Sequence, residues 1–182
     1  MFASLAKVKE VDAMMSFVSD SYKWHQELCK AFDGQQREKN YLFSISSSGM
    51  NYNVFTLSEN KPVNTGLLFW QTKEIPECFF KGKSFCFELK ANPVFCRPSK
   101  GVRGKRVPIL DRQKLVGWMI RKGLDNGFSV NTESLEIGPP VTETFTIKGM
   151  LGRHTGVSFR GHLEVKDHKK FINAIKQGIG PS

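Results

Sequence analysis

The sequence lacks the patterns that mark metal sites and membrane spans. Its four cysteines form no CxxC pair and no cluster with histidine, which gives zinc coordination little support. No segment is long and apolar enough to span a membrane, and charged residues interrupt the apolar run at the N-terminus, which argues against a signal peptide. We therefore expect a reduced, cytoplasmic protein that uses no metal or other cofactor.

Acidic residues are scarce relative to basic ones. Lys and Arg number 27 against 17 Asp and Glu, so the 182-residue chain has a net charge of +10. Such an excess favours a polyanionic partner, and nucleic acid is the first candidate. The length fits one or two domains of ordinary size.

The first half of the sequence alternates between strand and helix patterns. FASLAKVKEV predicts a strand, and the acidic and serine residues of SDSY are suited to cap the helix that follows. YLFSIS and YNVFTLS, separated by a turn-prone segment, predict a hairpin. Residues 61–80 predict a short helix and another strand, so the expected order is β-α-β-β-α-β.

The second half repeats this order in part. SFCFELKAN predicts a strand, and RPSKGVRGKR predicts a loop because it is basic and rich in Gly and Pro. DRQKLVGWMIRKGLDNG predicts a helix that ends at a capping glycine, Gly127. Three strands and a last helix follow at FSVNTESLEI, ETFTIKG, GVSFRGHLEV and DHKKFINAIKQG.

Two split β-α-β units are the skeleton of the ferredoxin-like fold. We therefore expect an α+β protein with two tandem ferredoxin-like (RRM-like) domains and antiparallel sheets, at residues 1–82 and 83–182. The second domain lacks its last strand in this sequence. Because that strand normally pairs with the first, residues 85–89 should lie at or near an open sheet edge.

Five motifs follow one another along the chain: YKWHQ, FELKANP, RGKRVPIL, FRGHLEV and IKQGIGPS. With them the sequence resembles the CasE-type CRISPR RNA endoribonucleases, the repeat-cleaving subunits of type I-E Cascade. The resemblance implies metal-independent cleavage of CRISPR repeat hairpins in precursor CRISPR RNA (crRNA), giving a 2′,3′-cyclic phosphate and a 5′-hydroxyl. It also implies that the mature crRNA stays bound and that other Cascade subunits are partners. The alternative is a non-catalytic RNA-hairpin-binding subunit of the same fold.

His25 lies at the margin of the apolar stripe of its predicted helix, beside Tyr22 and Cys29. An isolated histidine there is more commonly a half-buried packing residue. The resemblance, however, implies that Tyr22 and His25 are the catalytic pair and that Lys30 matches a basic residue that helps in some members. An imidazole suits proton transfer, as base to the 2′-hydroxyl or acid to the 5′-oxygen, and both roles stay open. We expect Cys29 to pack.

Two basic segments are the predicted RNA contacts, although a run of like charges is usually only a solvated face. In the first, glycines allow the backbone to approach RNA phosphates closely. The second surrounds the turn of KGMLGRHTG, and the resemblance implies that this hairpin touches the RNA stem. The predicted RNA-binding residues are Arg97, Lys100, Arg103, Lys105 and Arg106 in the first segment and Lys148, Arg153 and His154 in the second.

Overall fold

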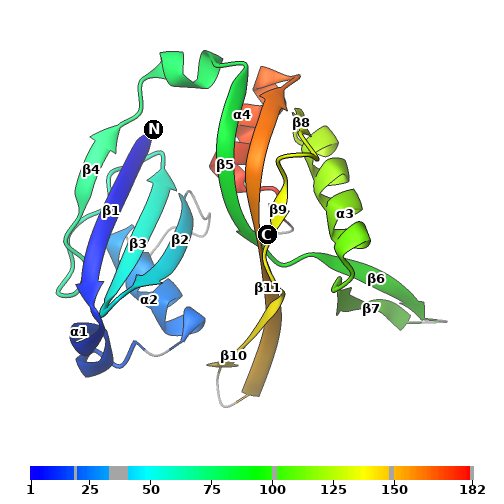
Figure 1. Ribbon diagram of the computed structural model, residues 1–182. Coiled ribbons are helices and arrows are strands. Elements are labelled where there is room, and N and C mark those ends of the chain that lie inside the picture. Colours follow the sequence, from blue (N-terminus) through cyan, green and yellow to red (C-terminus); the bar gives the residue numbers. More distant parts are fainter. Residues whose placement is uncertain (19, 33–40, 100–101, 148–149, 181–182) are drawn as a thin grey trace. The chain divides into compact units, whose positions relative to one another are not determined.

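The computed structural model describes residues 1–18, 20–32, 41–99, 102–147 and 150–180 (Figure 1). These residues divide into two compact units, which we describe one at a time. The first unit comprises Met1–Phe80, Phe145–Leu151 and Asn173–Gly178, and the remaining described residues form the second. Within the described residues, no helix has the length and apolar character needed to cross a membrane.

The first unit contains a four-stranded antiparallel sheet in the order β2-β3-β1-β4 (Figure 1). Its strands are β1 (Phe2–Lys9), β2 (Tyr41–Ser48), β3 (Asn51–Ser58) and β4 (Gln71–Glu74). The central strand β1 pairs with β3 along its whole length, from Phe2 opposite Ser58 to Lys9 opposite Asn51. This is the strand order of a ferredoxin-like domain, and the predicted strands are confirmed.

Helix α2 (Ser21–Ala31) packs on this sheet and follows the short helix α1 (Glu10–Met15). Asp20 caps α2, since its Oδ1 accepts a hydrogen bond of 2.8 Å from the Lys23 N–H, which confirms the predicted helix start. The core residues of α2 and the sheet are Trp24, Leu28, Ala31, Ala6, Val8, Tyr41 and Val54. This packing fixes the helix face whose margin carries the candidate site.

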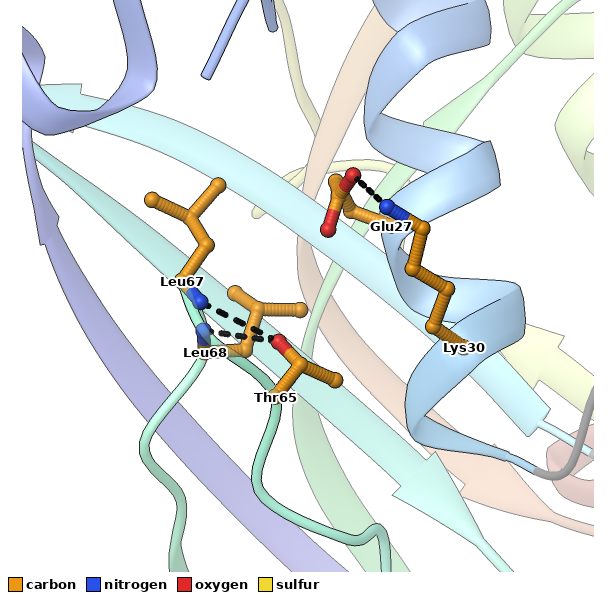
Figure 2. Close-up of polar contacts among 5 residues, drawn as sticks. All are labelled: Glu27, Lys30, Thr65, Leu67 and Leu68. Atoms are coloured by element: carbon orange, nitrogen blue, oxygen red, sulfur yellow. Dashed lines mark hydrogen bonds and ion pairs between the residues drawn. The ribbon is translucent and has the colours of Figure 1, made fainter. Parts of the chain in front are cut away.

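The predicted helix between β3 and β4 is wrong, because residues 59–70 form an ordered loop. The Thr65 hydroxyl accepts hydrogen bonds from the N–H groups of Leu67 and Leu68 (Figure 2), and the Asn64 side chain accepts one from Trp70. Such side-chain acceptors offer the backbone an alternative to helical hydrogen bonds. The loop also buries Leu68 completely, so it contributes to the core in place of a helix.

The second unit has a sheet around the long strand β11 (Met150–Val165). Its other strands are β5 (Ser84–Ala91), β8 (Phe128–Val130), β9 (Glu136–Ile137) and β10 (Val141–Ile147). β5 pairs with β11 from Ala91 opposite Val157 to Ser84 opposite Glu164. Among the described residues β11 is the only strand beside β5, so the predicted sheet edge at residues 85–89 is confirmed.

Helices α3 (Arg112–Asp125) and α4 (His168–Gln177) confirm the two helices predicted in this half. Asp111 caps α3 through a 2.9 Å hydrogen bond from the Lys114 N–H, and Asp167 caps α4 in the same way at 3.1 Å. Gly127, just after α3, has a φ of +79°, the left-handed conformation that favours glycine. Leu115, Trp118 and Met119 of α3 are buried, as the helical spacing predicts.

The predicted loop at residues 97–106 is also wrong. The chain there forms an antiparallel hairpin of β6 (Val94–Ser99) and β7 (Val102–Pro108). A Cβ on Gly104 would lie 2.8 Å from the Arg97 carbonyl oxygen, so glycine permits this close strand pairing. The β-branched residues Val94 and Val107 suit the pleated strands, and they outweigh the loop signal of the Gly and Pro residues.

Candidate functional site

The His25 ring meets two side chains through its Nδ1 atom. Nδ1 lies 3.4 Å from Sγ of Cys29, one helical turn later, and 3.5 Å from Oη of Tyr41, the first residue of β2. The Cys29 and Tyr41 atoms are themselves 3.6 Å apart, so the three groups form a closed arrangement that we call the His25–Cys29–Tyr41 cluster. Nε2 is the ring nitrogen that does not take part in this cluster.

Tyr41 is held firmly in this position. Its side chain is 6% exposed, and its ring stacks on Phe32 with 4.3 Å between ring centroids and 11° between ring planes. Burial, reinforced by the hydrogen bond with Cys29, raises the pKa of Tyr41 well above its ordinary value. The Tyr41 hydroxyl is therefore neutral at physiological pH and is able both to donate and to accept a hydrogen bond.

Tyr22 and Lys30 lie on the same helix as His25 but in different surroundings. Tyr22 is half-buried one turn before His25. Among the described residues the hydrogen bonds of His25 go to Cys29 and Tyr41 and not to Tyr22. Lys30 is exposed, and its Nζ lies 2.5 Å from Oε1 of Glu27 (Figure 2). An anionic ligand of Lys30 would therefore compete with Glu27.

The first basic segment presents cations on both faces of the β6–β7 hairpin. Arg97 lies opposite Lys105, and this pair shares a face with Phe95, because alternate residues of a strand point to the same side. Arg106, opposite Cys96, points to the other face. Arg97, Lys105 and Arg106 are all exposed. Lys100 and the side chain of Arg103 lie outside the described residues.

A groove on the second unit adds two cations that are not among the predicted RNA-binding residues. The groove has a volume of about 330 Å³ and is lined by Phe95, Ile109, Lys114, Gly117, Trp118 and Arg121. Lys114 and Arg121 are seven residues apart on α3, which is about two helical turns, so they lie on the same face of the helix. This spacing can be read from the sequence. Phe95, however, reaches this groove only because residues 94–108 form a hairpin, whereas the sequence predicts a loop at residues 97–106.

The described residues of the second basic segment lie near the start of β11. Arg153 is exposed, whereas the neighbouring His154 is half-buried, with its Nε2 3.3 Å from Oε2 of Glu143. Glu143 also forms an ion pair with Lys90, in which Oε1 of Glu143 lies 2.6 Å from Nζ of Lys90. His154 therefore faces a carboxylate, which makes it a weaker candidate for a phosphate contact than Arg153. Lys148 lies outside the described residues.

The described part of the chain contains no group of three or more His, Cys, Asp or Glu side chains arranged to hold a metal ion. All four cysteines are free thiols, and Cys29 is the one that lies in the candidate site. The chemically distinctive group of the first unit is therefore the His25–Cys29–Tyr41 cluster.

Comparison with known proteins gives consistent matches along the whole chain. Residues 5–182 match the family described as CRISPR associated protein. The chain is 27% identical to the CRISPR system Cascade subunit CasE of Escherichia coli K12 in an alignment of 178 residues that covers 90% of this chain and 86% of the relative.

Two solved structures have the same fold. One is the CRISPR endoribonuclease Cse3 bound to a 19-nucleotide RNA, with a TM-score of 0.81, 21% identity, and coverage of 100% of this chain and 94% of that chain. The other is the CRISPR-associated protein Cas6e of Escherichia coli K-12, with a TM-score of 0.73, 26% identity, and coverage of 100% and 93%. The similarity therefore covers both units.

Proposed function

The chain belongs to the family of CRISPR-associated proteins, and on this premise we propose that it is a metal-independent endoribonuclease that cleaves CRISPR repeat hairpins in precursor crRNA. Its relatives include a Cascade subunit and an endoribonuclease bound to RNA. The observation that carries the proposal is the half-buried His25, whose Nδ1 is engaged by Cys29 and Tyr41 while Nε2 stays outside that cluster. A histidine held in this way suits proton transfer better than packing alone.

The reaction needs no metal, because RNA carries its own nucleophile. The 2′-oxygen attacks the adjacent phosphorus, the bond from phosphorus to the 5′-oxygen breaks, and the products are a 2′,3′-cyclic phosphate and a 5′-hydroxyl. One proton leaves the 2′-hydroxyl and one reaches the 5′-oxygen. His25 performs one of these transfers, as base or as acid, through Nε2. Tyr22, one turn earlier, orients the reacting group by a hydrogen bond.

Lys30 offsets the additional negative charge of the transition state. Its ammonium is paired with Glu27 in the free protein, so this role requires that the bound phosphate replaces the Glu27 carboxylate as its partner. Surface ion pairs of this kind contribute at most about 1 kcal/mol, which a phosphate contact readily exceeds. Lys30 is consequently a supporting residue, and cleavage depends less on it than on His25.

RNA binding is the role of the second unit. The exposed cations of the β6–β7 hairpin contact the phosphates of the RNA stem, and Lys114 and Arg121 extend this basic surface along α3. Arg153 on β11 adds a further contact. The domain division that we propose follows these roles, with the catalytic helix in residues 1–82 and the RNA-binding hairpin in residues 83–182.

After cleavage the protein keeps the mature crRNA bound and acts in the cytoplasm beside other Cascade subunits. Retention agrees with the net charge of +10, since many phosphate contacts slow the release of an RNA product. The alternative function, a non-catalytic RNA-hairpin-binding subunit, requires the basic residues but not the His25–Cys29–Tyr41 cluster.

The test is to incubate the protein with hairpin RNA from the CRISPR repeat of its host, in EDTA, and to identify the product ends by mass spectrometry. We expect a single cut whose product ends are a 2′,3′-cyclic phosphate and a 5′-hydroxyl. RNA with a deoxy nucleotide just upstream of the cut should bind normally and stay intact, because the attacking hydroxyl is gone. A hairpin that binds but is never cut would favour the non-catalytic alternative, and cleavage that EDTA abolishes would contradict metal independence.

A further inference from the structure

Tyr41 and Cys29 meet His25 at one atom, although they come from different elements. Cys29 is four residues after His25 on α2, and Tyr41 begins β2, sixteen residues away in the sequence. Tyr41 is part of the sheet, where it pairs with Ser58 of β3, and its buried ring stacks on Phe32. Its hydroxyl is thus fixed by the core, which makes it a suitable anchor for a ring on the neighbouring helix.

A catalytic imidazole needs one nitrogen that is held and one that works. Whether Nε2 acts as base or as acid, Nδ1 must keep its proton throughout, because only Nε2 exchanges a proton with the RNA. A hydrogen-bond acceptor beside Nδ1–H maintains this tautomer. Both Oη of Tyr41 and Sγ of Cys29 can accept hydrogen bonds. Either atom of the Cys29–Tyr41 pair can be the donor between them, so the Tyr41 hydroxyl is able to donate its own proton to Cys29 while it accepts from Nδ1.

On this geometry we propose that Tyr41, assisted by Cys29, is a positioning residue that accepts the Nδ1–H of His25 and so selects Nε2 as the nitrogen that transfers the proton. The inference rests on the proposed ribonuclease function and assigns a residue outside the predicted catalytic set. The 3.5 Å separation of Nδ1 and Tyr41 Oη is long for a hydrogen bond to oxygen. Catalytic hydrogen bonds that are long in a free enzyme commonly shorten when the substrate is bound.

The two tautomers of the neutral His25 ring, protonated at Nδ1 or at Nε2, require opposite roles of the Tyr41 hydroxyl, as acceptor or as donor. If Tyr41 instead donated its proton to Nδ1, the neutral ring would carry its proton on Nε2 and would have no basic lone pair there. Tyr41→Phe removes the hydroxyl but keeps the ring that stacks on Phe32. Tyr52→Phe is the matched control, since Tyr52 packs edge-on against Trp24 in the same core, outside the cluster.

The first measurement is the ¹⁵N spectrum of the imidazole groups in the free protein, with the His25 signals identified by their loss in His25→Ala. The parent and Tyr52→Phe should show neutral His25 protonated at Nδ1, and Tyr41→Phe should shift the population toward Nε2–H. A parent spectrum dominated by Nε2–H would overturn the inference. This measurement uses no RNA, so it tests the inference even if the protein proves to be non-catalytic.

The second measurement is single-turnover cleavage with hairpin affinity determined in parallel. Tyr41→Phe should lower the cleavage rate about tenfold to a hundredfold with an unchanged Kd, as losses of a group that orients a functional histidine commonly do. Cys29→Ala should have a smaller effect, and Cys29→Ser, which restores an acceptor, should recover the parent rate. A Tyr41→Phe rate within threefold of the parent, with cleavage by the parent intact, would refute the positioning role and leave the proposed function standing.

Discussion

Replacing His25 by alanine separates chemistry from packing, because the two roles predict different losses. The ring is half-buried, and it contacts Cys29 and Tyr41 and lies near Phe43 at a centroid distance of 6.3 Å. Its removal leaves a partly solvated gap, so we expect a loss of about 1 kcal/mol in the free energy of unfolding. In a protein of this size that lowers Tm by roughly 2–4 °C.

The effect on the reaction should be far larger. Removal of a general acid or base typically costs roughly 10²–10⁴-fold in rate, which is about 2.7–5.5 kcal/mol in the activation barrier. His25→Ala should therefore retain its fold and its hairpin affinity and lose at least about a hundredfold in single-turnover cleavage.

Leu28→Ala is the matched control on the same helix. Leu28 is fully buried, so its truncation should cost about 2–5 kcal/mol and roughly 4–20 °C in Tm. Cleavage by this variant, measured well below its Tm, should stay within a few-fold of the parent. A folded His25→Ala protein with a near-parent rate would mean that His25 only packs. If His25→Ala lost more stability than Leu28→Ala, the burial argument would be wrong.

Three further predictions concern charge, pH and backbone. Replacing Arg97 and Lys105 together by Gln should reduce the magnitude of the slope of log K for RNA binding against log salt by roughly 0.7–0.9 per lost phosphate contact. The free protein should not be destabilised, since these like charges face each other across the hairpin. An unchanged slope would show that the two residues do not contact RNA. Lys176 of α4 pairs with Glu59 and holds the pKa of this carboxyl below its ordinary value. The pair therefore stabilises the fold at pH values above the ordinary pKa, and this contribution is lost as the pH falls through the lowered pKa. Glu59→Gln should lower Tm slightly at neutral pH and not in acid, and equal effects at both pH values would contradict the pairing. Gly127→Ala should lower the free energy of unfolding, measured by denaturant titration, by about 1–3 kcal/mol, because its Cβ would lie 2.5 Å from the Asp167 carbonyl oxygen at a φ of +79°. Gly66→Ala, whose Cβ would meet nothing within 4 Å, should have little effect.

The elements that the sequence predicted well are those whose signals are local. Asp20 caps α2 within a few residues of the apolar stripe that it starts, and the alternation of β1 matches its burial pattern. The errors arose where composition and pairing disagreed. Glycine and proline suggest a loop at residues 97–106, yet pairing between the two strands of the hairpin, such as Arg97 opposite Lys105, decides that segment. Residues 59–70 have enough apolar character for a helix, but Asn64 and Thr65 satisfy the backbone first.

The site shows the same division. Helical spacing alone brings His25 and Cys29 together, and the predicted position of His25 at the edge of the core agrees with its half-buried state. Tyr41 reaches the same nitrogen from another element, and no spacing rule connects residues of a helix and a later strand. The charge of Lys114 and Arg121 was visible in the sequence, but their relation to Phe95 depends on the hairpin.

The candidate residues fall into separate compact units, and this separation has a mechanistic consequence. His25, Cys29 and Tyr41 belong to the first unit, whereas the described cations of the hairpin, of α3 and of β11 belong to the second. The geometry of the cluster is fixed by the packing of α2 on its own sheet, through Trp24 and Leu28, and does not depend on the cations. Neutralising the hairpin should therefore weaken RNA binding while RNA that still binds is cleaved at the parent rate, because precise orientation of a reacting group comes from the rigid elements that carry it.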